Sequence, residues 1–118
     1  MNINFIVENI IIKKLFKAII EKGYYISIYN MEENTVSVSN DLEKLMTGLR
    51  TTHSDCFYVF ADPHKQGIGW IDAIYGNGVD VLSDWTIDLN DIMDPIMKFV
   101  DRVEEEEFSI EELCKLAR

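Results

Sequence analysis

The chain has 118 residues, of which 47 % are apolar and 27 % are charged. A chain of this length can bury a core without disulfides or a structural metal, and the composition excludes a disordered protein. The formal net charge is −10, and residues 1–50 carry six Lys/Arg and six Asp/Glu whereas residues 51–118 carry five against fifteen. The negative electrostatic field of such a chain repels nucleic acid and anionic membranes and attracts basic protein surfaces. We therefore predict a single domain over residues 1–118 that binds no nucleic acid directly.

The start of the chain has none of the features of a targeting segment. Lys13, Lys14 and Lys17 interrupt the long apolar run near the N-terminus, so we expect neither a signal peptide nor a membrane span. The two cysteines, Cys56 and Cys114, lie far apart in the sequence, a pattern typical of reduced thiols rather than of a disulfide framework. The expected location is the cytoplasm.

The first part of the chain predicts a helix, two strands and a second helix. Apolar residues recur at helical spacing over residues 6–22, and Gly23 would end that helix in a left-handed conformation. Residues 24–30 and 35–39 are rich in Ile, Val and Tyr, which favours a pair of strands joined at residues 31–34. Asn40-Asp41-Leu42-Glu43 has the form of a capping box, with Asn40 as the cap of the following helix.

The second part predicts three strands and two helices. Residues 56–61 form an apolar run that we expect to be the central strand, and residues 62–67 a turn. After Thr86 the pattern becomes helical, and we expect Asp94-Pro95 to begin the regular part of that helix because proline suits the first helical position. A second capping box at residues 109–112 would open a short last helix. The predicted order is α-β-β-α-β-β-β-α-α, an α+β fold with helices packed on an antiparallel sheet of about five strands.

Residues 70–86 organise the rest of the prediction, because Asn77-Gly78 is the strongest hairpin signal in the chain. A type I′ turn needs positive φ at both central residues, which Asn-Gly supplies at little steric cost. Counting outward from a two-residue loop predicts these pairs: Tyr75/Asp80, Ile74/Val81, Ala73/Leu82, Asp72/Ser83, Ile71/Asp84 and Trp70/Trp85. Each face of the hairpin would then hold apolar pairs and at least one carboxylate.

No catalytic or cofactor signature is present in the sequence. His53, Asp55 and Cys56 are close in sequence, but successive strand residues point to opposite faces, and no Ser or Cys stands in a nucleophile-elbow turn. With two histidines, no HExxH and no paired CxxC, a zinc site is not expected. We predict no catalytic residue, no metal ligand and no cofactor, and so a protein that is not an enzyme.

The candidate binding residues are aromatic and acidic side chains of the predicted hairpin. Aromatic rings can anchor a partner or stabilise the hairpin by cross-strand packing, and carboxylates can face a basic surface or cap helices. The acidic residues Asp72, Asp80, Asp84, Asp88, Asp91 and Asp94 could also hold a hard cation, although their spacing is not that of an EF-hand. The predicted partner-binding set is Trp70, Asp72, Tyr75, Asn77, Asp80, Asp84 and Trp85.

One motif, within residues 74–86, resembles a motif of a known group of proteins. Ile74-Tyr75-Gly76-Asn77-Gly78, followed by Asp80-Val81-Leu82-Ser83-Asp84-Trp85-Thr86, resembles small accessory proteins of bacteriophages and plasmids in which Tyr-Gly-Asn precedes Asp-Val-x-x-Asp-aromatic-Thr. The resemblance assigns no activity to any residue. It implies a gene of a mobile element, and small acidic proteins from that context are often inhibitors of host defence.

Three hypotheses follow. The first is a non-enzymatic protein whose acidic second half binds a basic surface, such as the nucleic-acid-binding groove of a restriction or CRISPR nuclease. The second is a protein that sequesters a nucleotide signal by stacking its base on Trp70, Tyr75 and Trp85. The third is a metal-dependent hydrolase that uses Asp72, Asp80 and Asp84, although the predicted register places Asp72 on the face opposite the other two. A homodimer is compatible with each of them.

Overall fold

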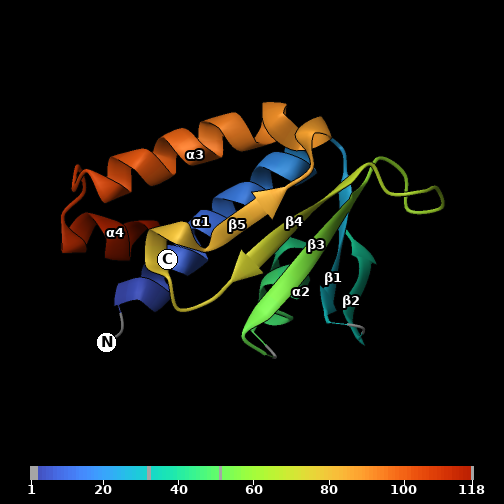
Figure 1. The fold of residues 1–118 in the computed structure, drawn as a ribbon, viewed down its shortest axis with the longest axis horizontal. Coiled ribbons are helices and arrows are strands. Elements are labelled where there is room, and N and C mark those ends of the chain that lie inside the picture. The colour runs from blue at the N-terminus through green and yellow to red at the C-terminus, as the bar shows by residue number, and fades with distance from the viewer. Residues whose placement is uncertain (1–2, 32, 51, 118) are drawn as a thin grey trace.

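A computed structural model describes residues 3–31, 33–50 and 52–117 (Figure 1). The helices are α1 (Ile3–Glu21), α2 (Leu42–Thr47), α3 (Asn90–Glu104) and α4 (Ile110–Leu116). The strands are β1 (Tyr25–Asn30), β2 (Glu33–Ser39), β3 (Ser54–Phe60), β4 (Gly69–Ile74) and β5 (Leu82–Trp85). Two short 3₁₀ turns, η1 (Gly78–Asp80) and η2 (Ile87–Leu89), flank β5. The predicted α+β class and the predicted order of helices and strands are confirmed.

The five strands form one sheet in the order β2-β1-β3-β4-β5, and every neighbouring pair is antiparallel. β3 lies at the centre, as its continuous apolar run predicts. The connection between β3 and β4 extends beyond the sheet, at the right of Figure 1. Three of the four neighbouring pairs are consecutive along the chain, and only β1 and β3 become neighbours across an intervening strand and helix, β2 and α2.

The core lies between one face of the sheet and the helices. α1 is the central helix, since it contacts β1 and the other three helices. Figure 1 shows α3 running alongside it. α1 is buried on more than one narrow stripe, because Ile12 and Phe16 are as inaccessible as Ile11 and Leu15. Sheet residues that point toward α1 complete a single core: Ile26, Ile28, Phe57, Val59, Ile71 and Ala73. Among the described residues, no helix combines the length and the apolar character that crossing a membrane requires.

The helix ends follow the local signals of the sequence only in part. Gly23 ends the first helical segment with φ +83°, and Ser109 and Glu112 form the predicted capping box. The cap of α2, however, is Asp41 and not Asn40, because the Asp41 carboxylate accepts a hydrogen bond from Lys44 N at 3.3 Å. Pro95 lies inside α3, which begins at Asn90. The prediction that the regular helix begins at Asp94-Pro95 was therefore wrong.

The connection between β4 and β5 differs from the predicted two-residue turn. Asn77 has φ −102°, which a type I′ turn does not allow, whereas Gly76 and Gly78 have φ +99° and +61°. The chain leaves β4 at Ile74, makes the 3₁₀ turn η1 and enters β5 at Leu82. The longer connection forms because η1 packs against α1, which a tight hairpin could not reach.

The register of β4 and β5 also differs from the prediction. Ala73 faces Leu82 as expected, but Asp72 then faces Asp84 and Ile71 faces Trp85, so Ser83 is an additional residue in β5. A bulge of this kind reverses the faces of the residues that follow it. The predicted pairs Asp72/Ser83, Ile71/Asp84 and Trp70/Trp85 are therefore wrong.

Candidate functional site

The face of the sheet that points away from the helices, which we call the open face, is the candidate site. Residues on it alternate along each strand with the core residues named above. None of its apolar or aromatic members belongs to the core or packs against it. The open face comprises Tyr25, Ser27 and Tyr29 of β1, Cys56, Tyr58 and Phe60 of β3, Trp70, Asp72 and Ile74 of β4, and Asp84 of β5.

Strand register arranges these side chains in rows across the sheet. Tyr29 faces Cys56, Cys56 faces Asp72, and Asp72 faces Asp84. The neighbouring row runs from Ser27 through Tyr58 to Trp70. Because directly opposite residues have Cβ atoms about 4.5–5.5 Å apart, each row brings together side chains that are distant in sequence. The open face is thus aromatic along one row and acidic at one end of the other.

Aromatic rings from both rows pack against each other and cover Ser27. Tyr29 and Tyr58 pack edge to face with ring centroids 5.2 Å apart, and Tyr58 remains 38 % exposed. Ser27, opposite Tyr58, is only 2 % exposed, and its Oγ has no hydrogen-bond partner among the described residues. A hydroxyl buried without a partner costs free energy. Ser27 is therefore covered by its neighbours on the open face, although no described helix lies over it.

The acidic end of the open face consists of Asp72 and Asp84. Asp84 is exposed and accepts a local hydrogen bond from Trp85 N at 2.9 Å. Neither carboxylate belongs to a salt bridge within residues 3–31, 33–50 and 52–117. Burial, together with the charge and hydrogen bond of Asp72, raises the pKa of the Cys56 thiol to about 11. The Cys56 thiol therefore stays protonated at physiological pH.

The other predicted binding residues lie elsewhere. Trp85 packs against the core and donates from Nε1 to Asn90 Oδ1 at 3.0 Å, on the face opposite Trp70. Tyr75 is also packed against the core, and Asn77 and Asp80 lie at the η1 turn beside α1. The structure therefore brings together Trp70, Asp72 and Asp84 of the predicted set and separates them from the remaining four residues.

Tyr75 belongs instead to a buried polar cluster that the sequence did not reveal, which we call the Glu8 cluster: Glu8, Arg50, Asp55 and Tyr75. Glu8 is 2 % exposed. Its Oε2 accepts hydrogen bonds from Gly76 N at 3.0 Å and Gly78 N at 2.8 Å, and its Oε1 lies 3.1 Å from Arg50 Nη2. The available sequence signal was a lone carboxylate on the apolar stripe of α1, three and four residues before Ile11 and Ile12. Glu8 attaches the turn after β4 to α1.

Arg50 and Asp55 complete this cluster. The Arg50 guanidinium lies over the rings of Phe5 and Tyr75, 4.3 and 4.6 Å from their centroids, and donates to Asn9. Asp55 Oδ2 accepts from Arg50 N at 3.0 Å and from the Tyr75 hydroxyl. Asp55 Oδ1 is buried without a partner in the described part of the chain. Burial raises the pKa of Asp55, and burial with the neighbouring Asp55 raises the pKa of Tyr75.

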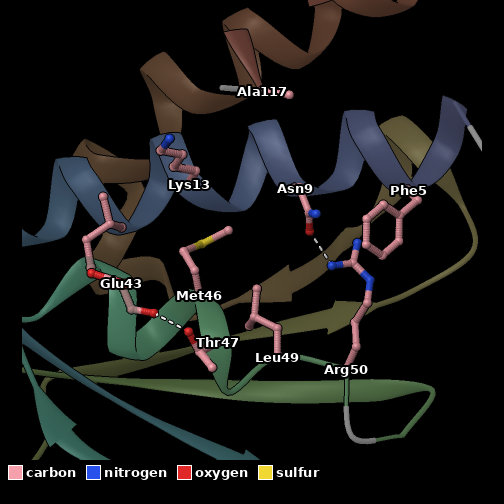
Figure 2. A pocket seen from close by; sticks show the side chains of 10 residues that line it. Phe5, Asn9, Lys13, Glu43, Met46, Thr47, Leu49, Arg50 and Ala117 are labelled. Carbon is pink, nitrogen blue, oxygen red and sulfur yellow. Dashed lines mark hydrogen bonds between the residues drawn. The ribbon is translucent and has the colours of Figure 1, made fainter. Parts of the chain in front are cut away.

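A hollow of about 630 Å³ lies between α1 and α2, beside the Glu8 cluster (Figure 2). Figure 2 shows Phe5, Asn9 and Lys13 of α1 facing Met46 and Leu49 across it. Arg50 at its end already binds Glu8 and Asn9. The hollow is lined by apolar and polar side chains in equal number, and its described lining offers no arrangement of a nucleophile and a base.

The geometry gives little support to a catalytic site, to a site that stacks a nucleotide base or to a metal site. His53 is exposed, and Asp55 and Cys56 lie on opposite faces of β3. Trp70 is separated from Tyr75 and Trp85 by the sheet, so these three rings cannot stack on one base. Asp72 and Asp84 share the open face, contrary to the predicted register, while Asp80 lies at η1. In the described part of the chain, no three His, Cys, Asp or Glu residues are grouped so that they could hold a metal ion.

Comparison of the chain with protein-family models, with curated proteins and with solved structures finds no match.

Proposed function

We propose that the chain is a non-enzymatic acidic binding protein of a mobile element that inhibits a host defence nuclease. The binding surface is the open face of the sheet. The partner offers a basic surface of the kind that otherwise holds nucleic acid, and occupation of that surface blocks access of DNA or RNA.

The observation that carries the proposal is the uncompensated acidic end of the open face. Asp72 and Asp84 face each other across β4 and β5 without a salt bridge in the described residues. Like charges directly opposite each other destabilise a sheet. A basic partner would turn that repulsion into attraction, and the net charge of −10 would steer its approach.

Aromatic side chains next to these carboxylates support a protein partner. Trp70 and Tyr58 lie beside the acidic end, and Tyr and Trp are enriched at the centres of protein interfaces. Phosphates of a nucleic acid would meet the carboxylates instead, so the same face disfavours direct binding of DNA or RNA. The resemblance of residues 74–86 to phage and plasmid accessory proteins supports the inhibitory role.

The test is inhibition of DNA cleavage by purified restriction and CRISPR nucleases, with the chain added in increasing molar excess. We expect cleavage by the target nuclease to fall. We expect the inhibition to weaken steeply as salt increases, because at physiological ionic strength salt screens interactions between exposed charges more than about 8 Å apart. Asp72→Asn/Asp84→Asn should inhibit less than the native chain.

The control is Asp101→Asn/Glu104→Gln, which removes the same charge from exposed positions of α3. Unchanged cleavage by every nuclease in the panel, together with no salt-eluted basic protein on a column of the immobilised chain, would contradict the proposal. Inhibition that is insensitive to salt would contradict its electrostatic basis.

A further inference from the structure

We infer that the open face recognises arginine specifically, within an extended basic segment that also carries an apolar side chain. This inference rests on the proposed function and adds the identity of the side chains that the partner inserts.

The acidic end brings together the groups that a guanidinium binds. Asp72 and Asp84 are directly opposite on neighbouring strands, and Trp70 lies two residues before Asp72 on the same face. A guanidinium is planar, forms paired hydrogen bonds with carboxylates and stacks on aromatic rings. A lysine ammonium is a compact, strongly hydrated point charge that uses only part of this arrangement.

Hollows on the open face offer room for side chains from a partner. One, of about 240 Å³, is lined by Cys56, Asp72 and Ile74 among others. Another, of about 330 Å³, lies between Tyr58, Trp70 and the loop before β4. Asp72 lines the first hollow, whereas Trp70 lines the second and Asp84 lines neither. A guanidinium bound between Asp72 and Asp84 therefore lies beside the first hollow and leaves the second, bounded by Tyr58 and Trp70, for an apolar side chain.

Charge complementarity selects this occupant over the alternatives. A second copy of the chain would bring another net charge of −10 and a second pair of carboxylates onto the same face. A single-stranded nucleic acid could stack on the rings but would place phosphates near Asp72 and Asp84. An arginine-bearing segment satisfies the carboxylates and the rings together.

The experiment uses two synthetic peptides and isothermal titration calorimetry on the full chain. In one peptide, arginine and phenylalanine alternate at every second position with serine between them, so that an extended conformation places both on one side. In the other, lysine replaces every arginine. We expect the arginine peptide to bind about tenfold more tightly than the lysine peptide, a difference of about 1.4 kcal/mol.

Variants locate the site. Asp72→Asn/Asp84→Asn should abolish the preference for arginine, and Trp70→Leu should reduce it, while Asp101→Asn/Glu104→Gln should weaken both peptides to a similar small extent. Thermal unfolding of each variant establishes that it is folded before binding is measured.

The outcomes separate this inference from the proposed function. If both peptides bind equally and both double variants weaken them equally, general electrostatic attraction remains and arginine recognition is overturned. If neither peptide binds while a nuclease is still inhibited, arginine recognition is overturned and inhibition of a nuclease, the proposed function, stands. A concentration-dependent dimer that uses the open face, or tighter binding of a single-stranded oligonucleotide than of the arginine peptide, would also overturn it. If neither peptide binds, no nuclease is inhibited and no basic partner is captured, both the arginine inference and the proposed function are rejected.

Discussion

Asp55 and Asp72 lie on adjacent strands of one sheet, yet their carboxylates meet opposite environments. Asp55 points toward the helices, where Arg50 and Tyr75 donate to it and little water reaches it. Asp72 points to the open face, where another carboxylate lies opposite. A buried charge must be paired for the chain to fold, whereas a surface charge can remain unpaired at small cost. This contrast predicts large stability effects in the Glu8 cluster and small ones on the open face, where effects on binding should dominate.

The largest effect is expected at Glu8. Glu8→Ala leaves the Arg50 guanidinium without its carboxylate and the amides of Gly76 and Gly78 without an acceptor. Removing one partner of a buried ion pair costs about 3–5 kcal/mol. Chemical denaturation should therefore show a large loss in the free energy of unfolding. Glu21→Ala, at the exposed end of α1, is the control, and an equal effect in both variants would contradict the role of Glu8.

The second-largest effect on stability is expected in the turn whose backbone amides donate to Glu8. Gly78 is buried with φ +61°, and a Cβ there would lie 2.8 Å from Asn4 Oδ1. Gly78→Val should cost about 1–3 kcal/mol because it forces a β-branched residue into the left-handed region. Gly76 has φ +99°, but a Cβ there would meet no atom within 4 Å, so Gly76→Ala should cost less. Thermal melts of the two variants rank them, and the reverse order would contradict the packing of η1 on α1.

A pH-dependent effect is expected at Asp55. Because burial raises its folded-state pKa above the ordinary 3.8, the folded state binds this proton more tightly than the unfolded state. The stabilising contribution of the group is therefore complete below pH 3.8 and is lost as the pH rises through the folded-state pKa. The free energy of unfolding of the native chain, minus that of Asp55→Asn, should decrease as the pH rises above about 4.

Asp101→Asn, on the exposed side of α3, is the matched control for that measurement. Denaturant titrations at several pH values provide the free energies. A difference between the native chain and Asp55→Asn that rises with pH would mean that pairing with Arg50 outweighs burial.

The smallest effect is expected on the open face. Asp72→Asn and Asp84→Asn each remove one of two like charges that face each other, so each should raise the free energy of unfolding by roughly 0.2–1 kcal/mol. Thermal melts at low and high salt measure this gain, which salt should diminish because it screens the repulsion. A marked loss of stability in either variant would identify that carboxylate as a structural acceptor.

The sequence alone determined the fold class, the order of helices and strands and the central place of β3. These follow from signals that are local, such as helical periodicity in residues 6–22, apolar strand runs, and a capping box at residues 109–112. It also identified Trp70, Asp72 and Asp84 as candidate binding residues. It did not reveal that these three, and not Tyr75 or Trp85, share one surface.

Only the tertiary structure decided which carboxylates are buried and which face the solvent. The partners of Glu8 lie 42 to 70 residues away along the chain, so no local pattern could pair them. The bulge at Ser83 allows both Leu82 and Trp85 to pack toward the core, and this extra residue turns Asp84 outward. Side-chain alternation in a strand is a local property, but the position of a bulge depends on what the strand packs against, and here both Leu82 and Trp85 pack toward the core.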